Sequence, residues 1–442
     1  MDLGRYAVTL AAVHLWGRQI GAVSLEENRQ TAAFEYDPAF VASGIQVSPL
    51  MLPLAAGVHS FPALAQESFH GLPGLLADSL PDKFGNALID AWLATQGRKA
   101  EDFDAVERLL YTGNRGMGAL EFKPAKGPRI RKAQKLDIDA LVALASEVLA
   151  HRNDLQVSFA DGRKREALRV ILRVGTSAGG ARAMAIIAWN PKTNEVRSGQ
   201  IQAGAGFSYW ILKFDGVTGN RDKELDDPKG YGAIEYAYHK MAQAAGITMA
   251  DCRLLEENGR RHFMTQRFDR TEDGGKLHMQ SLAALAHYDF NAAGAHSYEQ
   301  ALQVIRRLGL SMDVVEEQFR RMAFNIVARN QDDHVKNIAF LMDKAGQWSL
   351  SPAFDVTYSY NPSGPWTGLH QMSVNGKRDH FTPEDFKAVA QVAGLKRGRD
   401  KAILQEVAEA VSHWAALALE TCIPKSQRDR IAGSFRLDLA PK

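Results

Sequence analysis

Apolar residues recur at helical spacing in several segments of the chain, which predicts amphipathic helices there. One helix is predicted after Pro81, one from Ile234 onward, and a long one from near Met312 to Arg329. From about Thr382 the pattern is helical. The apolar sets at this spacing are Phe84, Leu88 and Trp92; Leu141, Leu144, Ala145 and Val148; Val315, Phe319, Met322 and Ile326; and Val407, Val411 and Trp414.

Short apolar runs bounded by turn residues predict strands between these helices. The first two runs, Tyr6–Trp16 and Ile20–Leu25, flank Gly17 and Arg18. They predict a strand, a turn and a strand rather than a signal peptide, because no basic cluster precedes the first run. The other predicted strands are Leu168–Val174, Ala183–Trp189, Tyr209–Phe214, Phe263–Phe268, Ile338–Met342 and Trp348–Ser351. This mixture of helices and strands predicts an α+β fold.

Composition limits the classes of protein to which the chain can belong. With 442 residues, 45% of them apolar, it can bury a core large enough for two or three sub-domains. Its 53 basic and 51 acidic side chains give a net charge of +2, which argues against a dedicated polyanion binder. Two cysteines cannot form a disulfide framework, and no apolar run reaches about 18 residues. We therefore expect a cytoplasmic protein.

The strongest chemical pattern lies around Asp332. Asn337 follows Asp332 by five residues, and Asp355 comes after a predicted hairpin whose turn is Asp343–Gln347. Phosphoryl transfer needs a carboxylate near the attacking hydroxyl and oxygen ligands for Mg²⁺, and protein kinases carry these groups in the same order. Asp and Asn also cluster in ordinary turns and helix caps. The residues alone leave both interpretations open.

Two further segments fit a nucleotide site. The segment Gly175–Arg182 is rich in small residues, which let backbone N–H groups approach phosphate oxygens. It lacks the Gly-Lys-Ser/Thr of a Walker loop, and an ordinary hairpin turn is the alternative. Lys213 ends a predicted strand and Glu235 opens a helix. One interpretation is that these two side chains form the Lys–Glu ion pair of kinases. The other is that Lys213 is solvated and that the helix dipole stabilises the Glu235 carboxylate.

Taken together, these segments resemble the HipA family of bacterial kinase toxins, and the resemblance covers most of the chain. The matching segments are Ser79–Asp82, Thr176–Arg182, Ile211–Phe214, Ile234–Tyr236, Gln266–Arg270, Asp332–Asn337 and Ser351–Asp355. The resemblance implies an α+β fold with a protein-kinase-like core. It divides the chain into a strand-rich N-terminal sub-domain (1–122), a nucleotide-binding part (136–270) and an all-helical C-terminal sub-domain that carries the catalytic loop (271–442).

The resemblance also implies residue roles in an ATP- and Mg²⁺-dependent serine/threonine protein kinase. Asp332 would be the catalytic base or orienting group, and Asn337 and Asp355 would hold Mg²⁺. Ser177 would be autophosphorylated, and Gln266–Phe268 would form the adenine hinge, with Asp269 on the ribose side. The implied nucleotide-binding set is Ala178, Gly179, Gly180, Ala181, Arg182, Lys213, Gln266, Arg267, Phe268, Asp269, His334 and Lys336.

Two positions depart from the pattern of the family that the chain resembles. Met184 stands where lysine is frequent, so one phosphate contact is expected to be missing. Asp333 stands where glycine is common, and a second carboxylate beside Asp332 is expected to recruit metal or to raise a pKa by like-charge repulsion. Both departures bear on rate and nucleotide affinity more than on the class of reaction.

The partners that the resemblance implies are a small helix-turn-helix antitoxin of the HipB type, a protein substrate such as an aminoacyl-tRNA synthetase, and operator DNA bound mainly through the antitoxin. No membrane contact is expected. Two other functions stay open. One is a small-molecule phosphotransferase of the aminoglycoside type, which shares a similar Asp-x4-Asn loop. The other is a weakly active kinase fold that serves mainly as a co-repressor.

Overall fold

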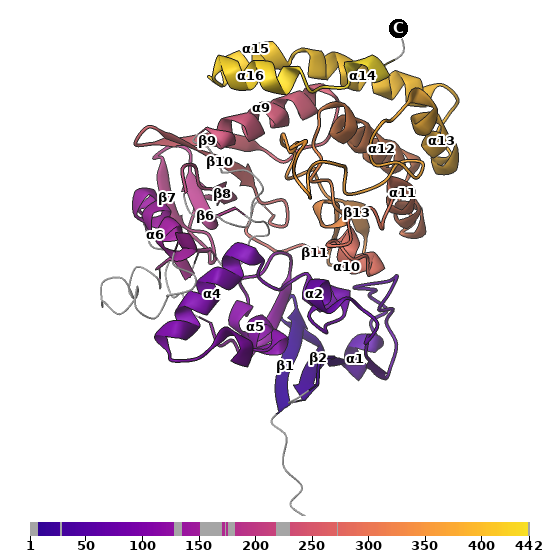
Figure 1. Ribbon diagram of the computed structural model, residues 1–442. Helices are drawn as coiled ribbons and strands as arrows, with labels where there is room; N and C mark the ends of the chain where they lie inside the picture. The colour runs from indigo at the N-terminus through magenta and orange to yellow at the C-terminus, as the bar shows by residue number, and fades with distance from the viewer. Residues whose placement is uncertain are drawn as a thin grey trace, which may run out of the picture.

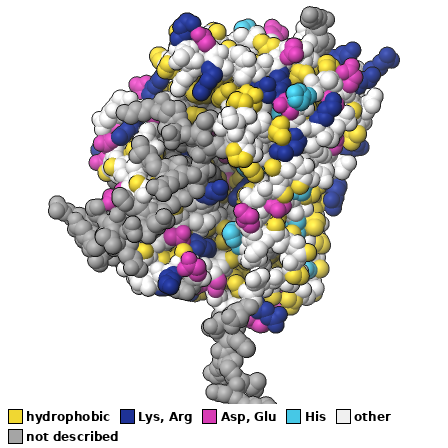
Figure 2. All heavy atoms as spheres, in the orientation of Figure 1, with side chains coloured by type: hydrophobic (Ala, Val, Ile, Leu, Met, Phe, Trp, Pro, Cys, Tyr) yellow, Lys and Arg dark blue, Asp and Glu magenta, His cyan; other side chains and the backbone are white. Residues whose placement is uncertain are grey.

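The computed structural model describes residues 8–26, 29–127, 135–150, 170–172, 174–175, 182–217, 230–271 and 273–440. These residues form an N-terminal domain, a second sheet with helices packed on it, and a helix-rich C-terminal part (Figure 1). No helix among them is both long enough and apolar enough to cross a membrane. On the face shown in Figure 2, acidic and basic side chains are interspersed, in keeping with the net charge of +2.

The N-terminal domain is built on a five-stranded antiparallel sheet in the order β4-β3-β2-β1-β5. Trp16 and Gly17 connect the first two strands with positive φ values of 49° and 82°, as two-residue hairpin turns of type I′ require. The predicted strand, turn and strand is thereby confirmed for residues 8–26. The strands are β1 (Val8–Leu15), β2 (Arg18–Glu26), β3 (Ala33–Tyr36), β4 (Val58–His59) and β5 (Leu120–Lys123).

Helices complete this domain. The helix predicted after Pro81 is confirmed: it begins where the side chain of Asp82 accepts a hydrogen bond from the backbone N–H of Gly85. Phe84 and Leu88 on this helix are fully buried, as their spacing predicted. The helices are α1 (Pro38–Val41), α2 (Gln66–Phe69), α3 (Gly74–Ala77), α4 (Lys83–Thr95) and α5 (Ala105–Thr112), with a 3-10 turn η1 (Ala100–Asp102).

A second five-stranded antiparallel sheet follows, in the order β7-β6-β8-β10-β9. Helix α6 (Ile138–Ala150) packs against α4, so one hydrophobic core joins this sheet to the N-terminal domain. Helix α9 (Tyr231–Ala244) packs on β9 and β10. Three predicted strands are confirmed here. The strands are β6 (Met184–Asn190), β7 (Glu195–Ser198), β8 (Ser208–Lys213), β9 (Cys252–Glu257) and β10 (Arg260–Gln266).

The strand predicted at Leu168–Val174 is wrong. Residues 170–172 and 174, the part of this segment that the structure describes, are helical. Ile171, Leu172 and Val174 are all fully buried. The run is only seven residues long, and over so short a run spacing alone does not separate a buried strand from a buried helical turn.

The C-terminal part combines a three-stranded antiparallel sheet with a stack of helices. The sheet order is β11 (His278–Ser281), β12 (Ala339–Met342) and β13 (Trp348–Leu350), which confirms the predicted hairpin. Because of this sheet, the expected all-helical description holds only for the regular elements within residues 383–440. The helices are α10 (Leu282–Ala286), α11 (Tyr298–Arg307), α12 (Met312–Val327), α13 (Pro383–Ala393), α14 (Arg399–Ser412), α15 (Trp414–Glu420) and α16 (Lys425–Ala432), with 3-10 turns η2 (Val335–Asn337) and η3 (Leu437–Leu439).

A buried ion-pair cluster at Asp269 joins the N-terminal domain to the rest of the chain. The Asp269 carboxylate is fully buried and accepts hydrogen bonds from Arg267, Arg270 and the backbone N–H of Gly118. Arg270 in turn donates to the carbonyl of Gly118 at 3.2 Å. Burial opposes the charge on Asp269, but the two arginines outweigh burial and hold its pKa far below the usual range.

We expect Asp269→Asn to destabilise the protein by about 3–5 kcal/mol, because it leaves two buried guanidinium groups without a counter-charge. Since the folded-state pKa of Asp269 is lowered, its contribution is present above about pH 4 and is lost as the pH falls. The gap in melting temperature between wild type and variant should therefore narrow in acid. The control is Asp273→Asn, a carboxylate on an exposed turn, which should melt like wild type. Equal melting of wild type and Asp269→Asn at neutral pH would contradict this account.

Candidate active site

A buried lysine draws together three parts of the chain. Lys213 is the last residue of β8, and its Nζ donates to Glu235 Oε1 of α9 at 2.5 Å. The same Nζ also donates to Asp355 Oδ1, in the segment after β13. Burial acts against the charge of Lys213, but Asp355 and Glu235 outweigh it and raise the pKa. Lys213 is therefore charged in the folded protein. Of the two alternatives that the sequence left open, the ion pair between Lys213 and Glu235 is the one that the structure shows.

Glu235 is held from two sides. Its Oε1 accepts from Lys213, and its Oε2 accepts from Arg182 at 2.9 Å. Both the Glu235 and the Arg182 side chains are almost completely buried. Arg182 was expected to contact the nucleotide. In the structure, Arg182 is instead a second cation, after Lys213, that pairs with Glu235. No spacing rule predicts this contact, because Arg182 and Glu235 are 53 residues apart in sequence.

The five-residue spacing from Asp332 to Asn337 closes a compact loop. A 3-10 turn, η2, brings the Asn337 side-chain amide back to donate to the backbone carbonyl of Asp332 at 2.8 Å. The Asp332 carboxylate is 43% exposed, and its Oδ1 accepts from the indole N–H of Trp366 at 2.7 Å. The loop thus presents an accessible carboxylate beside a fixed amide. Trp366 lies 34 residues away in sequence and was not predicted.

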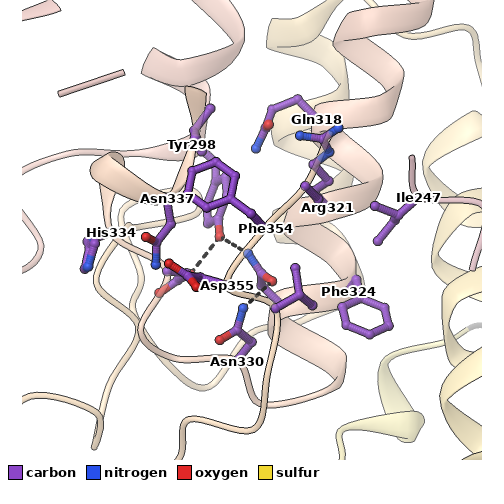
Figure 3. A pocket seen from close by; sticks show the side chains of 15 residues that line it. Ile247, Tyr298, Gln318, Arg321, Phe324, Asn330, His334, Asn337, Phe354 and Asp355 are labelled. Carbon is purple, nitrogen blue, oxygen red and sulfur yellow. Dashed lines mark hydrogen bonds between the residues drawn. The ribbon is translucent and has the colours of Figure 1, made fainter. Parts of the chain in front are cut away.

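Asn337, His334 and Asp355 line one pocket, whose wall includes Phe354 and Tyr298 (Figure 3). Asp355 has a left-handed backbone with φ of 53°, a conformation that Asp tolerates better than most residues. Strained backbone of this kind is concentrated at functional sites. The structure therefore brings Asn337 and Asp355, the two predicted metal ligands, to the same pocket.

The donor set of this pocket fits Mg²⁺ and not a metal held wholly by protein. Among the described residues there is no group of three or more His, Cys, Asp or Glu side chains that could hold a metal ion. Mg²⁺ usually keeps several waters and binds through one or two carboxylates together with substrate phosphates. Because the Asn337 amide nitrogen is committed to Asp332, its amide oxygen remains as a donor beside the Asp355 carboxylate.

The expectation for Asp333 was wrong. Its carboxylate is buried and accepts from Tyr298 Oη at 2.7 Å, from His370 Nδ1 at 2.8 Å and from the backbone N–H of Gln371 at 2.7 Å. Burial acts to raise its pKa, but the interaction with His370 and the other hydrogen bonds outweigh burial and lower it. With both oxygens so engaged, Asp333 serves the packing of the loop and does not recruit metal.

The predicted adenine hinge is only partly arranged for that role. The backbone N–H groups of Gln266 and Arg267 already donate to the carbonyls of Asp251 and Tyr209. Phe268 lies against Phe354, with ring centroids 5.5 Å apart. Asp269 is not placed for the ribose-side role that was expected of it. Its carboxylate is fully buried and bonded to Arg267, Arg270 and Gly118, so it is not accessible to a ribose.

The remaining predicted nucleotide contacts differ in how the structure places them. His334 lines the pocket, and Lys336 Nζ lies 4.8 Å from the ring centroid of Phe290. Met184 is buried and lies opposite Lys213 in the sheet register, so it offers no charged group there. Six residues of the glycine-rich segment lie outside the described residues: Thr176, Ser177, Ala178, Gly179, Gly180 and Ala181.

Two family models match the chain. The model of the HipA N-terminal domain matches residues 11–123, and that of the HipA-like C-terminal domain matches residues 176–415. The second match alone spans more than half of the chain. The fold is thus of the HipA class, α+β with the kinase-like core that the resemblance implied. The chain belongs to the HipA family.

Individual relatives agree with this assignment. A curated protein of Sinorhizobium fredii, "Putative kinase Y4mE", is 26% identical over 222 residues; these are 45% of this chain and 51% of the relative. The chain thus matches about half the length of that relative. HipA in a complex of Shewanella oneidensis HipA, HipB and operator DNA superposes with a TM-score of 0.67 at 16% identity, covering 97% of this chain and 95% of that one. That similarity shows a shared fold.

A second solved structure is more distant. The Helicobacter pylori proinflammatory kinase CtkA superposes with a TM-score of 0.36 at 12% identity, covering 59% of this chain and 91% of its own. A superposition of this quality supports no conclusion.

Proposed function

We propose that the protein is an ATP- and Mg²⁺-dependent serine/threonine protein kinase of the HipA type. The observation that carries the proposal is the Lys213 ammonium, buried between Glu235 and Asp355. In protein kinases, one lysine pairs with a helix glutamate and holds nucleotide phosphates, while a later aspartate holds Mg²⁺. The same three residue types meet here, from a strand, a helix and the segment after a hairpin.

Each side chain then has a task in phosphoryl transfer. Lys213 would leave Asp355 and bind the ATP phosphates, while Glu235 keeps the lysine oriented. Mg²⁺ held by Asn337 and Asp355 would supply charge neutralisation at those phosphates. Asp332, the exposed carboxylate of the loop, would accept or orient the proton of the attacking hydroxyl.

The proposal extends to location and partners. HipA of Shewanella oneidensis is found with HipB and operator DNA. By that similarity, this chain would act in the cytoplasm with a small helix-turn-helix antitoxin, and operator DNA would be bound mainly through the antitoxin. A net charge of +2 and the mixed charges of the face in Figure 2 suit a protein that binds DNA through a partner. The substrate would be a protein, with an aminoacyl-tRNA synthetase as one candidate.

One observation favours a second function, a weakly active kinase fold that acts mainly as a co-repressor. Met184 lies opposite Lys213 on the neighbouring strand and is buried, so this position brings no cation to the phosphates. Comparison of phosphotransfer in wild type and Met184→Lys separates the two functions. Efficient transfer by wild type favours the kinase, and transfer that rises only in the variant favours the co-repressor.

Asp332→Ala should reduce phosphate transfer by about 10²–10⁴-fold, the range for loss of a general base. ATP binding should persist, because the variant keeps Lys213, Asn337 and Asp355. Transfer of radiolabelled phosphate to casein measures the rate, and calorimetric titration measures binding. Asp343→Ala is the matched control, an exposed aspartate in the nearby hairpin turn. Wild-type rates in the Asp332 variant would remove this residue from the mechanism.

Slow autophosphorylation is expected at Ser177, on the grounds of family resemblance, because this residue lies outside the described residues. A phosphate there adds a charge of about −1.5 to −2, which should repel the ATP tail and inactivate the enzyme. Intact mass spectrometry during incubation with Mg-ATP tests this, with Ser177→Ala as the control. No mass gain in an initially unmodified preparation that is active on casein would contradict this regulation and leave the kinase proposal in place.

A further inference from the structure

Two consecutive carboxylates of the catalytic loop hold one later segment, Trp366–Gln371, which we call the strap. Asp332 Oδ1 accepts from Trp366 Nε1 at 2.7 Å. Asp333 accepts from His370 Nδ1 at 2.8 Å and from the backbone N–H of Gln371 at 2.7 Å. Successive residues of an extended loop point in different directions, so the strap is bound at both of its ends.

The strap is anchored from behind. Arg436, near the C-terminus, donates to His370 Nε2 at 2.9 Å and to the carbonyl of Ile326 at 3.0 Å. An arginine can only donate, so this contact leaves the imidazole hydrogen on Nδ1, where it is directed at Asp333. The Gln331 side chain donates to the carbonyl of Thr367, the residue after Trp366, at 3.1 Å. These bonds fix the backbone that carries the Trp366 indole.

The two aspartates differ sharply in their surroundings. The Asp333 side chain is 1% exposed, and the Asp332 side chain is 43% exposed. A carboxylate this exposed would turn about its side-chain bonds unless a neighbour held it. The indole N–H holds Oδ1, and within the part of the chain that the structure describes no hydrogen bond engages the second oxygen of Asp332. The Trp366 ring also lies near that of His334, with centroids 6.4 Å apart, and forms a wall beside the carboxylate.

We propose that Trp366 is a positioning residue for Asp332 and sets the direction from which the acceptor hydroxyl approaches. This inference rests on the proposed kinase function. In the transfer, the acceptor hydroxyl gives its proton to the second oxygen of Asp332. The hydroxyl oxygen forms a bond to the γ-phosphorus, and the bond from that phosphorus to the bridging oxygen of ADP breaks. The indole keeps its own hydrogen and acts through Asp332, by holding it in one rotamer.

Trp366→Phe tests this, because it keeps an aromatic ring and removes the N–H. We expect kcat for transfer to casein to fall about 10- to 100-fold, the size of one hydrogen bond to a charged group, while the KM for ATP is unchanged. Trp348→Phe is the matched control. Its indole N–H donates to the carbonyl of Gln46 and not to a residue of the catalytic loop, and its loss should leave kcat at the wild-type value.

The decisive comparison uses the Asp332→Ala background. If Trp366 acts through Asp332, Trp366→Phe should cause no further loss there. A second loss as large as the first would overturn the proposal, because the indole would then act on substrate or on folding.

A readout that needs no activity is the indole N–H resonance of Trp366 in protein labelled with ¹⁵N-tryptophan, identified by its disappearance in Trp366→Phe. Asp332→Ala should shift this resonance upfield, and an unchanged resonance would overturn the proposed contact. Failure of the kinase function would be seen separately, as a wild-type protein that transfers no phosphate.

Discussion

The structure of the site depends on one buried positive charge. Lys213 is buried at the end of β8, and its ammonium can remain charged there only because Glu235 and Asp355 meet it. That requirement fixes the position of α9 relative to the second sheet and draws the segment after β13 toward both (Figure 1). Arg182 completes the balance on Glu235. A charge that needs two partners in the resting protein is also one that a polyanionic phosphate chain can recruit by replacing one of them.

The catalytic loop shows how neighbouring residues of one type acquire different tasks. Asp332 remains accessible and accepts one indole hydrogen bond. Asp333 is sealed within a network of hydrogen bonds that reaches Arg436 through His370. A buried carboxylate with satisfied oxygens stabilises the loop backbone, whereas an exposed one is available for chemistry. The adjacent pair is therefore better described as one anchor and one reactive group than as two competing charges.

Much of this arrangement could be predicted from the sequence, and the remainder has a common physical origin. Helices such as α4 and α12 have apolar residues at a regular spacing, and β1 and β2 flank a turn with its own residue preferences, so local rules find them. The pairing of Lys213 with Glu235 could be predicted, because protein kinases have a Lys–Glu ion pair of this kind. The contact of Trp366 with Asp332 and the burial of Asp269 could not be predicted, since both depend on chain segments that only the tertiary fold brings together. The helical turn at 170–172 was missed because the apolar run is too short for its spacing to separate a strand from a helix.

If the buried lysine marks a site for the phosphates of Mg-ATP, calorimetric titration of Mg-ATP into wild type and Lys213→Met should show it. Methionine has a similar length and no charge, and Glu235 would keep Arg182 as a partner. Lys344→Met, on the exposed turn after β12, is the control. We expect wild type and the control to bind Mg-ATP, and Lys213→Met to bind it at least about 10-fold more weakly, as for the loss of one charged hydrogen bond. Equal binding by Lys213→Met, or no binding by wild type, would contradict this expectation.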